Sequence, residues 1–286
     1  KGDIIYKVGD VEASSMELDV LVRQESRGER KTPVGVTVLR DGEGVELHII
    51  RDTVEVTTVE YQMLEEETGY ILVTQFELVT GEQFKEAVDE LTKQGMKKLI
   101  IDLRDNPGGV LDAVVEMAAY LLPEDKLEGT LVSTSDKNGK GIRYYCADGK
   151  IQYEANDGQG KDNRYPKPDG HQLDIPMVVL INGNSASASE VLAGALRDYG
   201  SAELVGTTSF GKGIVQSLVP LADGSAVKMT ISHYYTPSGF DLHAKGLDPD
   251  VEIEQEVPED LEEAFEIPLD RDNQVQKALE VLEEKR

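Results

Sequence analysis

The sequence predicts an α/β fold, in which helices flank a mostly parallel β-sheet, preceded by a smaller module of mixed α and β structure. First, strand-like and helix-like segments alternate after about residue 55, an order typical of parallel sheets. Second, residues 98–103 and 175–181 are apolar on both faces, as buried parallel strands are. Third, turns rich in glycine or small residues follow these strands.

The smaller module is expected to span residues 1–54, and the larger domain residues 55–286. In the module, a short strand over residues 3–8 precedes a helix over residues 14–27, whose apolar residues fall mostly on one face. Two β-rich runs then flank Asp41-Gly-Glu-Gly44, and glycines in such a turn favour a β-hairpin. The module is therefore of the α+β type.

The larger domain is expected to repeat the order strand, turn, helix. The expected elements are strands at 68–76, 98–103 and 175–181, helices at 81–94, 110–122 and 189–199, a hairpin at 128–153 and a final helix at 273–286. Residues 154–172 are rich in Gly, Asn, Asp, Pro and Lys, which predicts an exposed loop. Residues 248–270 hold eleven acids and no base, which predicts largely solvated surface.

The charge of the chain excludes several classes of function. The chain has 29 Lys+Arg residues against 55 Asp+Glu residues, a net charge of −26 at pH 7. This argues against nucleic acid and anionic membranes as partners, because both need clustered Lys and Arg. No apolar run approaches the roughly 20 residues of a membrane span. One cysteine, Cys146, and four histidines leave no internal disulfide and little material for a metal site, so we expect neither a metal nor a cofactor.

The first turn that could carry chemistry is residues 102–109, Asp-Leu-Arg-Asp-Asn-Pro-Gly-Gly. Its two glycines allow backbone geometry that other residues avoid. At the end of a strand, such a turn can present N–H groups at a helix N-terminus, where a developing oxyanion is stabilised. The alternative is a plain turn with no chemical role. Considered by itself, this stretch favours the plain turn. For Asp102 and Arg104 we expect an ion pair or a contact that stabilises the turn.

The second turn, residues 182–190, places small residues between a buried strand and a helix, where open α/β sheets hold ligands and nucleophiles. Ser187 and Glu190 have the spacing of a capping box, in which the serine caps the helix. The nucleophile motif Gly-x-Ser-x-Gly is not present, because Ser187 stands where its last glycine would be. Spacing alone therefore favours Ser187 as a helix cap over Ser187 as a nucleophile.

The third turn, residues 206–213, nearly spells the phosphate-binding loop Gly-x-x-x-x-Gly-Lys-[Ser/Thr]. However, Gly213 replaces the hydroxyl that would bind Mg²⁺, and residues 214–221 are strand-like rather than helical, which argues against nucleotide binding. Lys212 lies between two glycines in an apolar stretch. Desolvation there would lower the pKa of the lysine and let it act as a general base for a serine.

Together the three turns resemble the carboxy-terminal processing proteases, also called tail-specific proteases. Two later stretches continue the resemblance in the family's order, Tyr234-Tyr-Thr-Pro-Ser-Gly239 and Gly246-Leu-Asp-Pro-Asp250. The resemblance covers about residues 1–282. It implies a protease core related to the ClpP/crotonase-like fold. It also implies a serine endopeptidase that cleaves peptide bonds near the C-terminus of flexible protein substrates.

The resemblance implies roles for three side chains. The family's nucleophile is the middle serine of its Ser-Ala-Ser-Ala-Ser motif, which is Ser187 here, and its base is the lysine of Phe-Gly-Lys-Gly, which is Lys212. Gln216 matches the glutamine that orients this lysine. On a strand, positions 212 and 216 share a face, so the two side chains can be neighbours.

The resemblance also implies an oxyanion hole of backbone N–H groups, which we place at Gly108 and Ala188, with Gly109 as a substitute for Gly108. It implies no metal and no cofactor. The implied partners are protein or peptide substrates with flexible C-termini, and a regulatory adaptor or a second copy of the chain. The implied location is extracytoplasmic, in the bacterial cell envelope (the periplasm or the outer face of the membrane). The expected membrane tether is an N-terminal segment absent from this sequence.

The module over residues 1–54 resembles the second half of a PDZ domain, through its order strand, helix, hairpin with Gly2-Asp3-Ile4-Ile5 at its head. In the family, the PDZ domain captures the C-terminal residues of a substrate. The half without a counterpart here would include the carboxylate-binding loop. An unidentified α+β module is the alternative.

Other functions are open to the same residues. The main alternative is a PDZ-containing scaffold or binding protein whose protease-like domain is inactive. An acyl-transfer or thioester-processing enzyme is a further alternative, although it would need a basic patch that the chain lacks. A serine–histidine mechanism would need His233 or His243, the two histidines near the later motifs.

Overall fold

The computed structural model describes residues 2–54, 56–122, 129–147, 150–155, 160–162, 173–261 and 267–284. The chain divides into two compact units, Lys1–Val56 and Thr57–Arg286. This division lies two residues from the boundary expected after residue 54. Whether the first unit is half of a PDZ domain stays a prediction.

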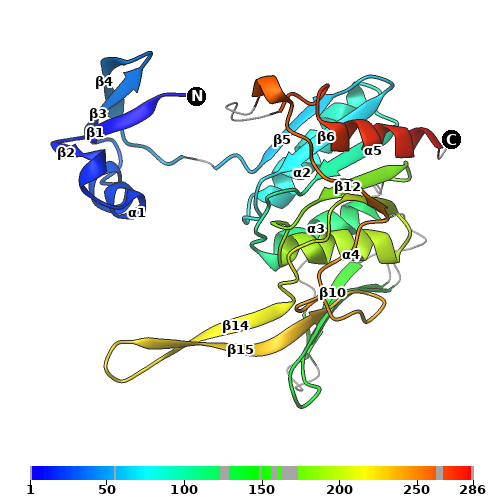
Figure 1. The fold of residues 1–286 in the computed structure, drawn as a ribbon. Coiled ribbons are helices and arrows are strands. Elements are labelled where there is room, and N and C mark those ends of the chain that lie inside the picture. Colours follow the sequence, from blue (N-terminus) through cyan, green and yellow to red (C-terminus); the bar gives the residue numbers. More distant parts are fainter. Residues whose placement is uncertain are drawn as a thin grey trace. The chain divides into compact units, whose positions relative to one another are not determined.

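The first unit contains a four-stranded antiparallel sheet in the order β2-β1-β3-β4 (Figure 1). Its strands are β1 (Ile4–Val8), β2 (Val11–Glu12), β3 (Pro33–Arg40) and β4 (Glu43–Ile50). The predicted hairpin is confirmed as β3–β4. Asp41 and Gly42 connect the two strands with φ angles of 51° and 81°, as a two-residue turn matching the twist of a hairpin requires.

The helix expected over residues 14–27 is broken into short pieces. They are a 3₁₀ turn (Ala13–Ser15), α1 (Leu18–Leu21) and a π-helical turn (Val22–Ser26). The end of this segment is held by Arg51, whose guanidinium donates to the carbonyls of Glu25 and Ser26, both at 2.8 Å. The apolar pattern correctly predicted helical structure in this segment. It could not predict where the segment ends, because that end is held by Arg51, which follows the distant strand β4.

The second unit is built on a six-stranded sheet in the order β16-β13-β12-β7-β6-β5. Its strands are β5 (Val59–Met63), β6 (Thr68–Val73), β7 (Lys98–Asp102), β12 (Met177–Ile181), β13 (Ala202–Gly206) and β16 (Val251–Glu252). Every neighbouring pair is parallel except β5–β6. The predicted mostly parallel sheet is confirmed.

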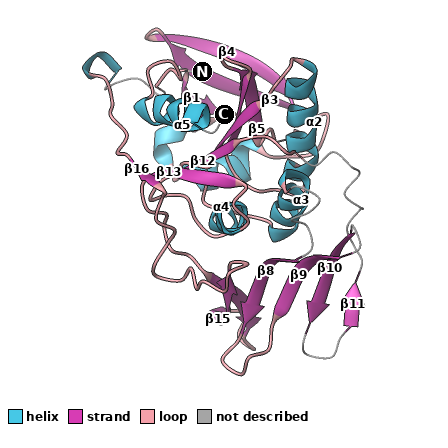
Figure 2. Ribbon diagram, turned by 90° about the vertical axis from the view of Figure 1, so that its right-hand side faces the viewer, coloured by secondary structure: helices cyan, strands magenta, loops and turns pink. Residues whose placement is uncertain are grey.

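Helices cover both faces of this sheet (Figures 1 and 2). α2 (Thr80–Lys93), α3 (Leu111–Leu121) and α4 (Ala188–Asp198) lie on one face, and α5 (Asn273–Glu284) lies on the other. Successive residues of β7 point to opposite faces. Ile101 joins the core under α2–α4 and Ile100 joins the core under α5, and both are fully buried. The prediction that this strand is apolar on both faces is confirmed, as is the final helix.

A second, antiparallel sheet has the order β11-β10-β9-β8-β15-β14. Its strands are β8 (Gly129–Ser135), β9 (Ile142–Ala147), β10 (Lys150–Ala155), β11 (Gly160–Asp162), β14 (Ile214–Pro220) and β15 (Ala226–Tyr235). The hairpin expected over residues 128–153 belongs to it. Strands β14 and β15 extend outward as a two-stranded hairpin (Figure 1, yellow).

Two expectations about loops need correction. Residues 154–172 do not form one loop, because they contain the end of β10 and strand β11; residues 156–159 and 163–172 lie outside the described residues. The acidic stretch 248–270 is not only solvated surface. β16 pairs with β13, and Val251, Ile253 and Leu269 pack against the core under α5.

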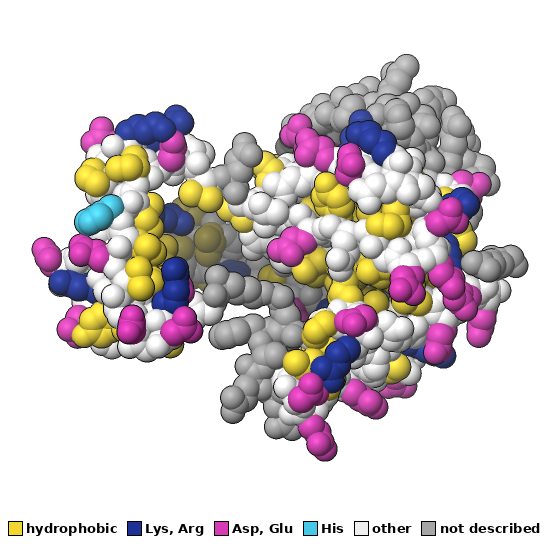
Figure 3. All heavy atoms as spheres, turned by 90° about the horizontal axis from the view of Figure 1, so that it is seen from above, with side chains coloured by type: hydrophobic (Ala, Val, Ile, Leu, Met, Phe, Trp, Pro, Cys, Tyr) yellow, Lys and Arg dark blue, Asp and Glu magenta, His cyan; other side chains and the backbone are white. Residues whose placement is uncertain are grey.

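Acidic side chains are numerous on the face of the molecule that Figure 3 shows. On the face seen in Figure 3, Asp and Glu side chains are scattered rather than gathered in one patch. In the part of the chain that the structure describes, no helix is long and apolar enough to cross a membrane.

Candidate active site

Two neighbouring strands of the parallel sheet end at the candidate site. β7 and β12 pair with Leu180 opposite Asp102, so their carboxyl ends meet at one edge of the sheet, where α/β folds hold ligands. The chain then runs through residues 103–110 to α3 and through residues 182–187 to α4. The first and second turns singled out in the sequence are therefore brought together.

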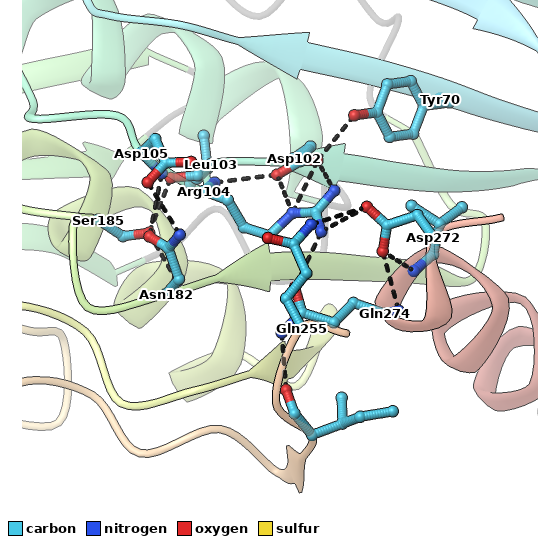
Figure 4. Close-up of polar contacts among 12 residues, drawn as sticks. Tyr70, Asp102, Leu103, Arg104, Asp105, Asn182, Ser185, Gln255, Asp272 and Gln274 are labelled. Atoms are coloured by element: carbon cyan, nitrogen blue, oxygen red, sulfur yellow. Dashed lines mark hydrogen bonds and ion pairs between the residues drawn. The ribbon is translucent and has the colours of Figure 1, made fainter. Parts of the chain in front are cut away.

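Hydrogen bonds fix these two turns to each other. The carbonyl of Asn106 accepts from the N–H of Ala186 and from Ser189 Oγ, both at 3.0 Å. Asp105 Oδ1 accepts from the side-chain amides of Asn182 at 3.0 Å and Asn184 at 2.7 Å (Figure 4 shows the first). Because side chain and backbone both take part, neither turn can move far without the other.

The three serines of the second turn differ in what they contact. Ser185 and Ser189 are fully buried. The hydroxyl of Ser185 donates to the carbonyl of Leu103 at 2.7 Å and accepts from the N–H of Asn182 at 2.9 Å, and Ser189 is engaged as described above. Ser187 lies between them and is partly exposed. Among the three, Ser187 is therefore the serine that a substrate can reach.

The backbone of Ser187 is strained. Its φ of 57° and ψ of −113° lie outside the regions that residues with a side chain prefer, which costs about 1–3 kcal/mol. Ser187 precedes the first residue of α4, and its N–H donates to Glu190 Oε2 at 2.8 Å. A strained residue with a reachable hydroxyl at a helix N-terminus is typical of nucleophiles that follow a strand.

Gly108 lies directly against this serine. A Cβ at Gly108 would come within 2.6 Å of the carbonyl oxygen of Ala186 and 2.9 Å of Ser187 Cβ, and its φ is 100°. The N–H of Gly108 donates to the side-chain oxygen of Asn106 at 2.9 Å. Ala188 opens α4, and amides of a first helical turn have no partner within the helix.

Gly109 also needs to be glycine. Its φ is 146°, and a Cβ there would come within 2.0 Å of the carbonyl oxygen of Phe76. Around it, Phe76 N–H donates to the Gly108 carbonyl at 3.0 Å, and Val110 N–H donates to the Phe76 carbonyl at 2.8 Å. The paired glycines thus let the turn pass between the end of β6 and the start of α4.

The third turn reaches the site through Glu190. Its Oε2 accepts from the N–H of Ser187 and from the N–H of Lys212, each at 2.8 Å. Two atoms that are each 2.8 Å from a third are at most 5.6 Å apart, so the backbone nitrogens of Ser187 and Lys212 lie within that distance. The structure therefore brings together the two residues that the sequence proposes as nucleophile and base.

Residues 209–216, here called the base segment, comprise the end of the third turn and the start of β14, and their two candidate catalytic side chains are in solvent. Lys212 and Gln216 are both exposed, and Phe210, an apolar residue two positions before the lysine, is itself 63% exposed. The expected apolar enclosure of Lys212 is therefore wrong for this structure. Gln216 lies on β14, where it pairs with Thr230 of β15. Lys212 precedes this strand, which begins at Ile214, and the register shifts between Val215 and Gln216. The expectation that positions 212 and 216 share a face of one strand is therefore wrong, because Lys212 is not part of the strand.

A histidine–aspartate contact lies in a segment that is hydrogen-bonded to the base segment. His233 Nδ1 is 3.2 Å from Asp241 Oδ2, and the rings of His233 and His243 are edge to face with centroids 5.0 Å apart. Burial raises the pKa of Asp241, but the N–H of His243 and the contact with His233 outweigh it, so the net pKa is lowered. Ala244 N–H donates to the carbonyl of Gly211 at 2.9 Å, which fixes this segment to the base segment. Sequence spacing did not reveal this cluster, because His233 and Asp241 come together through the bend after β15.

The described residues contain no group of three His, Cys, Asp or Glu side chains placed to hold a metal ion.

Asp102 and Arg104 form the expected ion pair, on the α5 face of the sheet (Figure 4). Arg104 Nη1 also donates to Asp272 at 2.8 Å, and Tyr70 donates its hydroxyl to Asp102 at 2.7 Å. Burial and the carboxylate raise the pKa of the Tyr70 hydroxyl. This buried network borders a cavity of about 760 Å³. Its atoms satisfy one another, so it anchors α5 to the turn after β7 rather than supplying a reactive group.

Comparison with protein families finds a match to the model described as Peptidase family S41 over residues 67–253. A carboxy-terminal-processing protease of Bartonella bacilliformis is 34% identical over 264 residues, which are 90% of this chain and 55% of the relative. A probable CtpA-like serine protease of Staphylococcus aureus is 36% identical over 252 residues, 88% of this chain and 46% of the relative. The chain thus spans about half the length of these curated relatives.

Solved structures of related proteases share the fold of this chain. The photosystem II D1 C-terminal processing protease superposes with a TM-score of 0.54 at 30% sequence identity, covering 88% of this chain and 63% of that one. A putative S41 protease of Bacteroides fragilis gives a TM-score of 0.60 at 16% identity, covering 100% and 74%. The second likeness concerns the fold alone.

Proposed function

The chain belongs to peptidase family S41, and on that premise we propose that it is a serine endopeptidase of the carboxy-terminal processing type. It would cleave peptide bonds near the C-terminus of flexible protein substrates, using Ser187 and Lys212 as a dyad. The observation that carries this proposal is the shared contact with Glu190, which holds the backbone nitrogens of the two residues within 5.6 Å of each other.

In the proposed reaction, Lys212 Nζ takes the proton from Ser187 Oγ as the oxygen attacks the substrate carbonyl carbon. The tetrahedral intermediate collapses by breaking the C–N bond, and the leaving amine takes the proton from Lys212, which leaves an ester between Ser187 Oγ and the acyl part of the substrate. A water molecule, deprotonated by the same lysine, then attacks this ester. The second intermediate collapses by breaking the bond to Ser187 Oγ, which takes the proton back from Lys212, and the new C-terminal acid is released. Gln216 would orient the lysine side chain.

The start of α4 supports stabilisation of the oxyanion. The N–H of Ala188 belongs to the first turn of the helix, where the positive end of the helix dipole favours developing negative charge. A second donor would come from Gly108, whose Cα packs beside Ser187. In this structure the N–H of Gly108 is bonded to Asn106, so Gly108 would have to share or exchange that bond. Gly109 is the substitute donor.

Because Lys212 is exposed, we propose that the bound substrate itself helps to complete the catalytic site. Lys212 and Gln216 stand in water here, and a peptide laid over Ser187 would exclude that water. Because electrostatic contacts strengthen when water is excluded, the bound peptide would complete the site.

The proposal is tested by mass spectrometry of a disordered protein digested by the chain. The Ser187→Ala and Lys212→Ala variants are each expected to lose cleavage by about 10³-fold or more, with the fold unchanged. Lys228→Ala removes another exposed lysine, from the β14–β15 hairpin, and is expected to cleave normally. Full activity in either dyad variant would refute the assignment, and peptides ending near the substrate C-terminus would support the tail preference.

A binding protein with an inactive protease-like domain is the second candidate. Two observations favour it, the solvent-exposed Lys212 and the engaged N–H of Gly108. Digestion by the wild-type chain separates the two candidates. Recognition of substrate tails by the first unit, an extracytoplasmic location and an adaptor or second copy as partner are further parts of our proposal, supported by the sequence resemblance.

A further inference from the structure

The carboxylate of Glu190 is the point at which the second and third turns join. The residue is 1% exposed, and its two oxygens accept four hydrogen bonds. Oε2 accepts from the N–H groups of Ser187 and Lys212, both at 2.8 Å. Oε1 accepts from Ser209 Oγ at 2.6 Å and from the N–H of Gly211 at 2.7 Å.

These four contacts require an acceptor on both sides. An ionised carboxylate offers two oxygens and no donor, whereas the amide of glutamine presents an NH₂ group on one side. On either side that NH₂ would face at least one backbone N–H, of Gly211 or of Ser187 and Lys212, and leave it without its acceptor. Charge-assisted hydrogen bonds are also about twice as strong as neutral ones. The arrangement is therefore specific for glutamate in its charged form.

The rest of the base segment depends on the same contacts. Ser209, bonded to Glu190, also accepts from the N–H of Leu247 at 2.7 Å, and the N–H of Phe210 donates to the carbonyl of Ser185 at 3.0 Å. The side of the base segment that faces α4 is thus anchored from residue 209 to residue 212. Beyond Lys212, the chain enters the projecting hairpin. The position of the base therefore relies on what holds these four residues.

We propose that Glu190 is a positioning residue for the dyad, in addition to its place in the helix cap. Its carboxylate holds the strained amide of Ser187 and the amide of Lys212 on one oxygen, so it sets the separation of nucleophile and base. It touches neither substrate nor the transferred proton. This inference rests on the proposed function for its catalytic consequence, but its structural part does not depend on activity.

The variants for the test are Glu190→Gln and Glu190→Asp, with Asp272→Asn as the matched control. Asp272 is also a buried carboxylate, 2% exposed, that accepts from two first-turn amides of a helix and from side-chain donors. It lies at α5, on the other face of the sheet. Its loss should reduce stability much as the loss of Glu190 does. The comparison therefore separates positioning from general stability.

The first readout is amide hydrogen exchange, which needs no activity. In Glu190→Gln, the amides of Ser187 and Lys212 are expected to exchange at least about tenfold faster, while Asp272→Asn leaves both protected. Glu190→Asp keeps an acceptor on both sides but is one methylene shorter, so it should restore part of the protection. Unchanged exchange at both amides in Glu190→Gln would overturn the proposal.

The second readout is steady-state cleavage of a peptide substrate. Small displacements of reacting groups can cost about 100-fold in rate, so kcat of Glu190→Gln should fall by about that factor with KM changed less than threefold. Asp272→Asn should keep kcat within about threefold at a temperature where it is folded. A Glu190→Gln variant with wild-type kcat would refute the positioning role while leaving the protease assignment intact. A wild-type chain that cleaves nothing would instead refute the proposed function, and the exchange data would still decide the structural part.

Discussion

The nucleophile turn and the base segment meet at Glu190, but the chain holds their side chains very differently. In the nucleophile turn, residues 182–190, the serines on either side of Ser187 are fully buried and hydrogen-bonded. In the base segment, residues 209–216, the backbone is anchored at its start while Lys212 and Gln216 are exposed. The fold therefore preorganises the attacking group and places only the backbone of the base. We expect a bound substrate to order the lysine side chain, which otherwise has many rotamers in water.

The nucleophile turn should be most sensitive to a change at Gly108, which packs against it from the neighbouring turn. Gly108→Ala would put a Cβ 2.6 Å from a backbone oxygen at a φ of 100°, so strain and overpacking together should cost about 3 kcal/mol or more and abolish cleavage. Urea unfolding and a cleavage assay measure both effects. Gly183→Ala is the matched control within the nucleophile turn, because its Cβ would have no atom nearer than 4.0 Å. Equal stability of the two variants would contradict a tightly packed nucleophile turn.

Removal of one buried hydroxyl from the nucleophile turn should destabilise the protein less than Gly108→Ala does. Ser185→Ala leaves the N–H of Asn182 without its acceptor, and leaves the carbonyl of Leu103 only the longer bond from the N–H of Asn106 at 3.3 Å. The free energy of unfolding should fall by about 1–3 kcal/mol. Ser217→Ala, in the exposed hairpin, should change it by less than about 0.5 kcal/mol. Chemical denaturation of both variants tests the contrast, and a Ser217→Ala loss as large as that of Ser185→Ala would remove it.

The β14–β15 hairpin, which continues from the base segment, should tolerate changes to its exposed apolar side chains. Leu218 is 68% exposed on the β14–β15 hairpin, so Leu218→Ser should alter the unfolding free energy by less than about 0.5 kcal/mol. The thermal midpoint of the variant measures this. A loss near 2 kcal/mol would show that the side chain is covered in solution, and the hairpin would then not be an exposed element.

The smallest expected effect depends on pH. The pKa of Asp241 is lowered by the net effect of its hydrogen bonds, although burial opposes them. A lowered folded-state pKa stabilises the protein above the unfolded carboxyl value of about 3.9, and this contribution is lost as the pH falls through the folded value. Asp241→Asn should therefore reduce the thermal midpoint slightly at pH 6 and less at pH 3. A larger reduction at pH 3 than at pH 6 would contradict the sign.

Much of the fold could be predicted from local pattern. The β7 and β12 strands are apolar on both faces, and together with the alternation of strands and helices this indicated a buried, mostly parallel sheet with flanking helices. The Asp41-Gly42 turn was visible because only certain residues adopt positive φ. Strand β16 and the broken first helix were not predictable. Strand β16 is only two residues long, which is too short for a sequence pattern. The first helix ends where Arg51, distant in sequence, binds its last carbonyls.

The candidate site residues stand out in the sequence, but their environment does not, and their roles stay predictions. Ser187, Lys212 and Glu190 stand out by motif, and the first two are brought together as expected. The enclosure of Lys212 was wrong, because apolar neighbours along a chain do not bury a side chain unless distant segments pack over it. The strained backbone of Ser187 and the four contacts of Glu190 arise from three turns that are far apart in sequence. No spacing rule contains that information.

The most direct test of the central claim is the covalent labelling of the chain by a fluorophosphonate, with the modified residue located by mass spectrometry. We predict an adduct on Ser187 and none on the buried Ser185 or Ser189. The labelling rate should fall by at least about 100-fold in Lys212→Ala and stay unchanged in Lys228→Ala. An adduct on another serine, or labelling of Ser187 at the wild-type rate in Lys212→Ala, would contradict a Ser187–Lys212 dyad.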